Sequence, residues 1–207
     1  MNPVALVLDE VHQDALREMG SIGALHASSA LSDLIGEEVG VSVSGCSIHM
    51  VETLPRAFGD PEAPVVGVYM DVSAGENGII LLVFSESTAL QISDMVLHRS
   101  TAGHRTPDED DLAVMAEVGN ICASAYLSAI AEFLDIVMVP SPPGVATGML
   151  AALLQYPAIM AARYTDFAVI IRTELALGTA RHHGFILYIP DEDSQAKLQE
   201  RFGIGIP

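Results

Sequence analysis

The chain has 207 residues, half of them apolar, which is enough for one large domain or a fused pair of small ones. It carries 27 acidic and 9 basic residues, for a net charge of -18, so binding to nucleic-acid phosphates or to an anionic membrane is disfavoured. Lys197 is the only lysine, so nearly all basic residues are arginines. Arginine in place of lysine, together with a large excess of acidic residues, favours a halophilic source, because high salt screens the repulsion between the acidic groups.

Two cysteines, Cys46 and Cys122, have no spacing typical of metal ligands or of a disulfide framework. We interpret them as buried small hydrophobic residues. The chain shows no N-terminal signal segment, and no uninterrupted apolar run reaches the length of a membrane span. These features predict a cytoplasmic protein.

The first half contains signals for two helices and three strands. In order, these are a helix over 10–35, strands over 39–43, 65–72 and 78–84, and a helix over 86–98. Asp9 is the expected N-cap of the first helix, and Gly20 and Gly23 are expected to bend it. Residues 73–77 have the composition of a hairpin turn, and 99–105 that of a linker.

The second half repeats this order. Its expected elements are a helix that ends near 134, a strand over 136–139, a helical turn over 149–155, strands over 167–177 and 183–189, and a helix over 191–202. Thr106 is the expected N-cap of the long helix, with Pro107 at its first position and Glu109 three residues beyond the cap. The prolines of 140–143 should stop the strand before them.

Strands joined by hairpins predict an antiparallel sheet, and helices with one apolar face should cover it. We therefore predict an α+β fold in which two halves, about 1–103 and 104–207, are related by a pseudo-twofold axis. Both halves would form one domain.

A short helical phrase supports this duplication, because it occurs twice, 99 residues apart. The first copy reads Glu18-Met-Gly-Ser21-Ile-Gly-Ala and the second reads Glu117-Val-Gly-Asn120-Ile-Cys-Ala. The two long helices should therefore present equivalent polar faces, which differ at the Ser21 and Asn120 positions.

Glu117 and Asn120 are three residues apart, so on a helix their side chains project from the same face. Pro143 follows Asn120 after 22 intervening residues, so a proline-rich turn could return to support this helix surface. A carboxylate and a carboxamide on one face form a single polar site. Taken alone, such a pair is usually a solvated helix surface, and only the repetition and Pro143 favour a functional site.

These positions resemble the CheC family, the relatives of CheX and FliY. The family signature is Asp or Ser, three residues, Glu, two residues, Asn, twenty-two residues and Pro. Glu117, Asn120 and Pro143 match three of its four positions. The length, the two motif copies and the hairpins resemble the same family over nearly the whole chain, and the resemblance predicts a pseudo-symmetric CheC-like fold.

The resemblance implies a chemotaxis phosphatase that hydrolyses the phospho-aspartate of a CheY-type response regulator. Asn120 would orient a water for in-line attack, Glu117 would pair with the active-site lysine of the regulator, and Pro143 would support them. The enzyme would need no nucleophile or metal of its own, because the regulator holds Mg²⁺. Together with the acidic composition, the resemblance suggests archaeal-type motility.

The sequence departs from the signature in both copies. Ala113 occupies the first position of the second copy, although Asp110 and Asp111 lie close upstream. The first copy has Asp14 and Glu18, a possible second site. It also has Ser21 in place of Asn, Ser44 in place of Pro, and His26 five residues after Ser21. A serine hydroxyl has a shorter reach than a planar amide, so we expect this site to be weak or silent.

An adaptor without much catalysis is the main alternative. CheC relatives also associate with the receptor deamidase CheD, and some sit at the flagellar motor switch. A FliY-like variant is less favoured because nothing follows Pro207, and a CheX-like one because two motif copies remain. Adjacent His182 and His183 would face opposite sides of a strand and are interpreted as part of a turn rather than a metal site.

Overall fold

The structure, a computed structural model, describes residues 10–73, 78–100, 105–161, 165 and 167–202. Its helices are α1 (Glu10–Ile35), a 3₁₀ turn η1 (Val51–Thr53), α2 (Leu54–Ala57), α3 (Glu86–Val96), α4 (Glu109–Leu134), α5 (Leu150–Ala161) and α6 (Glu192–Phe202). Its strands are β1 (Val39–Met50), β2 (Pro64–Ser73), β3 (Gly78–Ser85), β4 (Val139–Pro140), β5 (Gly144–Met149), β6 (Phe167–Leu177) and β7 (Ala180–Ile189). The predicted N-cap Asp9 and parts of the predicted turn and linker lie outside the described residues.

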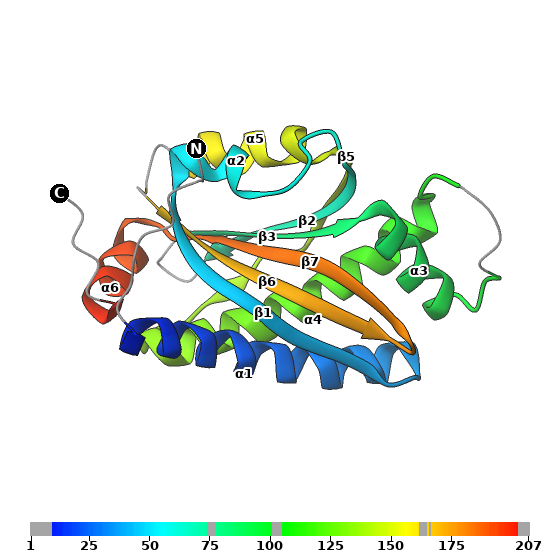
Figure 1. Ribbon diagram of the computed structural model, residues 1–207, viewed down its shortest axis with the longest axis horizontal. Helices are drawn as coiled ribbons and strands as arrows, with labels where there is room; N and C mark the ends of the chain where they lie inside the picture. The colour runs from blue at the N-terminus through cyan, green and yellow to red at the C-terminus, as the bar shows by residue number, and fades with distance from the viewer. Residues whose placement is uncertain (1–9, 74–77, 101–104, 162–164, 166, 203–207) are drawn as a thin grey trace.

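One seven-stranded antiparallel sheet connects the two halves of the chain (Figure 1). The strands follow the order β1-β6-β7-β3-β2-β4, and β5 also pairs with β2. The first-half strand β1 therefore lies beside the second-half hairpin β6–β7, and the second-half strand β5 lies beside the first-half hairpin β2–β3. This exchange of edge strands confirms the predicted α+β, pseudo-twofold fold.

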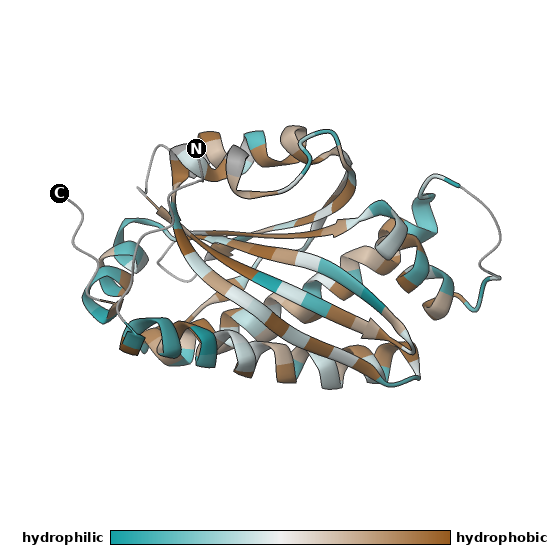
Figure 2. Ribbon diagram, in the orientation of Figure 1, coloured by the Kyte–Doolittle hydropathy of each residue, from teal (hydrophilic) through white to brown (hydrophobic). Residues whose placement is uncertain are grey.

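The two faces of the sheet carry separate hydrophobic cores. The helices α1, α3, α4 and α6 cover one face, with inward residues such as Val66, Val68 and Ile80. The short helices α2 and α5 pack on the other face, over residues such as Leu81 and Ile170. Because α2 and α5 cover only one end of that face, parts of β6 and β7 remain uncovered, and Figure 2 shows hydrophilic segments there.

Glycines on the long helices allow close packing, and α1 runs through Gly20 and Gly23 without interruption from Glu10 to Ile35. A Cβ atom at Gly119 would lie 2.3 Å from Cγ1 of Val68 on β2. A Cβ atom at Gly23 would lie 2.6 Å from Cδ1 of Tyr126 on α4. Both distances are shorter than any non-bonded contact between carbon atoms. The close approach of α4 to the sheet and to α1 therefore requires glycine at these two positions.

The start of α4 differs from the prediction, since Asp108 and not Thr106 is the N-cap. The Asp108 side chain accepts a hydrogen bond from the Asp111 backbone at 3.0 Å, and the Asp111 carboxylate accepts one from the Asp108 backbone at 2.8 Å. This reciprocal capping box satisfies two backbone donors at once.

Arginines from the preceding segment neutralise this acidic helix start. Arg105 pairs with Asp94 of α3 and with Asp111, while Arg99 pairs with Asp108, Asp110 and Asp111. The Asp111 side chain is only 1% exposed. Burial opposes its charge, but the hydrogen bonds from Arg105 and the Asp108 backbone lower the pKa of Asp111 below its ordinary value. The network therefore ties α3 to α4.

Several element boundaries also differ from the prediction. β1 continues to Met50 through a bulge between Val43 and Gly45, and β4 is confined to two residues. The prediction missed β5, whose side chains are mostly exposed and lack alternation. The expected turn over 149–155 is instead the longer helix α5, with Pro157 inside it. β7 begins at Ala180, so the polar pair His182 and His183 lies in the strand rather than in a turn.

Among the described helices, α4 is long and apolar enough by composition to span a membrane. In its most apolar window, however, 56% of the residues are buried inside the protein. Its apolar composition is therefore explained by its position between α1, α3, α6 and the sheet.

Replacing Gly119 by alanine should destabilise the protein although alanine is the better helix former. The methyl group would overlap Val68, and overpacking of this kind costs about 1 to 3 kcal/mol, against about 1 kcal/mol of helix propensity gained. Urea unfolding would measure the difference. A Val68→Ala background should reduce the cost of Gly119→Ala, and equal costs in both backgrounds would contradict the contact.

The Asp111→Asn substitution should lower the free energy of unfolding by about 2 kcal/mol at pH 7, because it removes charge-assisted hydrogen bonds to arginine. The folded-state pKa of Asp111 is depressed, so this contribution is present above about pH 4 and lost as the pH falls further. Denaturant unfolding at pH 7 and pH 3 measures it. An equal deficit at both pH values would contradict the ionic origin.

Candidate functional site

The second motif copy lies on the outer surface of α4. Glu117 is exposed and Asn120 is half-buried, while the two residues between them, Val118 and Gly119, are buried against the sheet. Because Gly119 lies directly over Val68, the helix cannot rotate without a clash, and the flanking polar side chains have a fixed direction. Within the described part of the chain, neither the Glu117 nor the Asn120 side chain takes part in a hydrogen bond or an ion pair, so both side chains can contact a partner.

The missing carboxylate at Ala113 is not replaced by its acidic neighbours. Ala113 is exposed on the motif face. Asp111 is buried and bonded to Arg105, and Asp110 accepts a hydrogen bond from Arg99 at 2.6 Å. Both carboxylates therefore belong to the helix-start network, which leaves the second copy with Glu117 and Asn120 alone.

Pro143 lies between β4 and β5, the two short strands that also contact α4. The turn is fixed to β2 by two hydrogen bonds: the Ser141 backbone donates to the Asp71 carbonyl at 2.8 Å, and the Asp71 backbone donates to Ser141 Oγ at 3.0 Å. The first-copy counterpart, Ser44, lies in the β1 bulge, beneath α1, where Val43 contacts Gly20. The fourth signature position of each copy, Pro143 or Ser44, therefore lies beside a motif helix, at a point where the regular strand pairing is interrupted.

The first motif copy lies on α1 and has a different chemistry. Ser21 Oγ donates to the carbonyl of Arg17 at 2.8 Å, so its hydroxyl hydrogen is directed back to its own helix. Asp14 lies 3.8 Å from Arg17, and Glu18 is exposed. At the position equivalent to Asn120, the first copy therefore presents a hydroxyl and not a side-chain amide.

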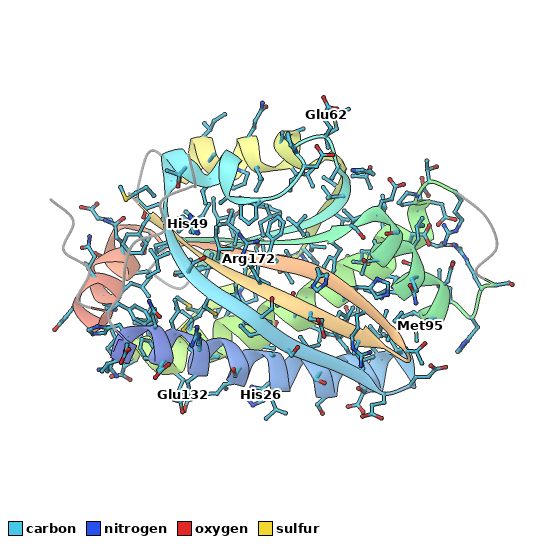
Figure 3. All side chains as sticks on the ribbon, viewed as in Figure 1. His26, His49, Glu62, Met95, Glu132 and Arg172 are labelled. Atoms are coloured by element: carbon cyan, nitrogen blue, oxygen red, sulfur yellow. The ribbon has the colours of Figure 1, made fainter. Side chains whose placement is uncertain are left out.

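Apolar side chains surround the first copy. Leu25 is 69% exposed and Ile22 is 38% exposed, one turn beyond Glu18 and Ser21. His26 points away from the sheet into solvent (Figure 3). On α4 the position equivalent to Leu25 is Ser124, whereas the position equivalent to Ile22 is again an isoleucine, Ile121. Sequence reasoning identified the polar motif but missed these exposed apolar residues, because helical apolar residues are usually buried.

The two motif helices lie side by side and run in opposite directions (Figure 1). Gly23 of α1 contacts Tyr126 of α4 at their crossing. The described residues include no group of three or more His, Cys, Asp or Glu side chains arranged to hold a metal ion. Cys46 and Cys122 are free, and burial raises the pKa of each thiol to about 12, which makes them poor nucleophiles at neutral pH.

Comparison with known proteins agrees with the motif. A model of the CheC-like family matches residues 112–146, the segment that contains Glu117, Asn120 and Pro143. The CheY-P phosphatase CheC of Bacillus subtilis (strain 168) is 25% identical over 205 residues, which cover 96% of this chain and 97% of that protein. The chain is therefore similar to CheC-like proteins, in its motif segment and along nearly its whole length.

Two further relatives of this CheC-like chain are FliY proteins. The flagellar motor switch phosphatase FliY of Bacillus subtilis (strain 168) is 30% identical over 90 residues, which cover 44% of this chain and 23% of that protein. The crystal structure of Thermotoga maritima FliY superposes with a TM-score of 0.77 at 20% identity, over 96% of this chain and 98% of that one. The structural match shows that the fold is shared.

Proposed function

We propose that this CheC-like protein removes the phosphoryl group from the phospho-aspartate of a CheY-type response regulator. The observation that carries the proposal is the pair Glu117 and Asn120, which project unpaired from one fixed face of α4. Similarity to a CheY-P phosphatase along 96% of the chain supports the same substrate class.

The chemistry needs little from the enzyme, because an acyl phosphate is already reactive and requires only a water held in line with the bond that breaks. The Asn120 side-chain oxygen can accept a hydrogen bond from such a water. Its half-buried position limits the rotamers that the amide can adopt, so the water would be held in one direction. This role is parallel to that of the water-positioning glutamine of GTPases.

Glu117 is suited to hold the two proteins in register. Its exposed carboxylate lies one turn before Asn120 and can pair with a lysine beside the phosphorylated aspartate of the regulator. The Mg²⁺ required for such phosphoryl chemistry belongs to the regulator, and we propose no resident cofactor for this chain. Both proteins would meet in the cytoplasm.

A second candidate function is that of an adaptor. It is favoured by the asymmetry of the motifs, because the α1 face lacks an amide and the α4 face lacks a carboxylate at Ala113. Such a protein would bind the regulator, the deamidase CheD or motor-switch components with little hydrolysis. Similarity to a flagellar motor switch phosphatase makes the motor switch the partner class to test beside the regulator.

Asn120→Ala should slow the stimulated dephosphorylation by about 10- to 100-fold, which corresponds to about 1.4 to 2.7 kcal/mol of barrier, with nearly unchanged binding. The assay is the decay of phosphorylated regulator in high-potassium buffer. Ser128→Ala, on an exposed position of the same helix, is the matched control. A variant as fast as the parent protein would exclude the water-orienting role.

Ser21→Asn should create activity on the α1 face, since Asp14 and Glu18 are already in place and the amide is the missing polar group, although Ser44 stays in the position of Pro143. In an Asn120→Ala background it should restore at least about a tenth of the parent rate. Ser29→Asn, two turns further along α1, serves as the control. If Ser21→Asn restores nothing while the protein stays folded, the α1 face is not equivalent to the α4 face.

A further inference from the structure

A groove of about 330 Å³ lies on the sheet face opposite to the motif helices. It is open beside α2, where the loop that contains Gly59 and Asp60 approaches the uncovered parts of β6 and β7. Its polar lining comes from Ser44, Asp60, Ser85, Arg172, Thr173 and His183, and its apolar lining from Val65, Val83, Leu150 and Phe185. Nothing in the proposed phosphatase chemistry uses this surface.

Arg172 supplies a fixed positive charge to the groove. Its Nη2 donates to the Ala57 carbonyl at the end of α2, at 2.7 Å, which holds the guanidinium between the sheet and α2 (Figure 3). Among the described residues, no carboxylate lies within ion-pair distance of it. The field of this charge reaches buried His49: burial first, and then Arg172, lower the pKa of that imidazole.

This unpaired cation is unusual in a chain with 27 acidic and 9 basic residues. Four other arginines, Arg17, Arg99, Arg105 and Arg181, each pair with an aspartate or a glutamate. Two acidic residues of the neighbouring segments have partners other than Arg172, and one of them, Asp60, lines the groove and keeps its negative charge. Asp60 Oδ1 accepts from the Glu62 backbone at 3.0 Å, and Glu174 lies 3.7 Å from Arg181. Arg172 therefore keeps donors for an external anion.

An apolar surface lies directly beside this cation. Arg172 and Phe185 are opposite each other in the register of β6 and β7, so both project from the same face, about 5 Å apart at their Cβ atoms. The Phe185 ring stacks on Phe58, with ring centroids 3.9 Å apart, which keeps it in place. The groove thus offers a cation and a rigid apolar wall within the reach of one amino-acid residue.

We propose that this groove binds the C-terminal carboxylate of a partner polypeptide whose last residue is apolar. The guanidinium of Arg172 would bind the carboxylate, and the side chain of the last residue would pack against Phe185 and Val83. In a C-terminal residue the carboxylate and the side chain leave the same carbon, which fits the short spacing of Arg172 and Phe185. The volume of about 330 Å³ holds one or two residues, at the lower end of ligand-sized sites.

A partner bound in this way leaves the α4 face free, because the two surfaces lie on opposite faces of the sheet. The protein could therefore hold one partner by its C-terminus while the regulator docks on the other side. This binding is separate from the proposed phosphatase activity, and the experiment below does not measure hydrolysis.

The test is an NMR titration of the full chain with the peptide acetyl-Gly-Ala-Phe as its free acid and as its C-terminal amide. The acid should shift the backbone amides of Thr173, Gly184 and Phe185, and the amide should bind at least about 10-fold more weakly, because it lacks the charge. Equal binding of both peptides would overturn the proposal. Equally tight binding of free phenylpropionate would assign the groove to small carboxylic acids and overturn the choice of a polypeptide.

Substitutions test whether the preference for the free acid depends on Arg172. Arg172→Gln should abolish the preference for the acid, Arg172→Lys should keep part of it, and Arg181→Gln should leave it unchanged. Since Arg172 also bonds to Ala57, Arg172→Gln could fail to fold, and Ser44→Glu provides an independent variant. Its carboxylate would compete for Arg172 from the β1 bulge, where Ser44 Oγ donates to the Arg172 carbonyl at 3.3 Å. An unchanged acid preference in folded Ser44→Glu would contradict the site.

Discussion

The contact between Gly119 and Val68 is the constraint on which the α4 face depends. A helix normally lies on a sheet at a distance set by its side chains, but here the backbone of α4 meets a β-branched residue of β2 directly. The contact falls between Glu117 and Asn120, so it fixes the depth and the rotation of the turn that carries both. The pair, exposed Glu117 and half-buried Asn120, thereby lies on a defined face of α4 without a side-chain hydrogen bond among the described residues.

The duplication provides two such helices, and strand exchange places the strands of both halves in one sheet. Each half supplies an edge strand to the hairpin of the other half, so neither motif helix has a complete sheet beneath it without the other half. The two faces have diverged inside this shared frame. The α1 face has a serine that bonds to its own helix and exposed apolar neighbours, whereas the α4 face has a free amide. One half can therefore change its surface chemistry while the fold is preserved.

Much of this arrangement was predictable from the sequence. The hairpins β2–β3 and β6–β7, and the long helices, follow from strong periodicity, and the motif copies follow from a repeat that needs no structure to detect. The weakly patterned elements could not be predicted. β5 is an exposed edge strand without alternation, and Asp108 caps α4 because its partner Asp111 is buried by arginines from a different segment. Likewise, no sequence pattern showed that Ser21 bonds to Arg17, or that Arg172 forms no ion pair with any carboxylate among the described residues.

The central claim is that Asn120 orients the water that hydrolyses a phospho-aspartate on a bound regulator. The most direct measurement is single-turnover decay of phosphorylated CheY-type regulator, with a saturating amount of this protein or of its Asn120→Ala variant. Saturation separates chemistry from binding. The account predicts fast decay with the parent protein and decay close to the intrinsic rate with the variant. Equal decay with both proteins, while each still binds the regulator, would contradict it and favour the adaptor function.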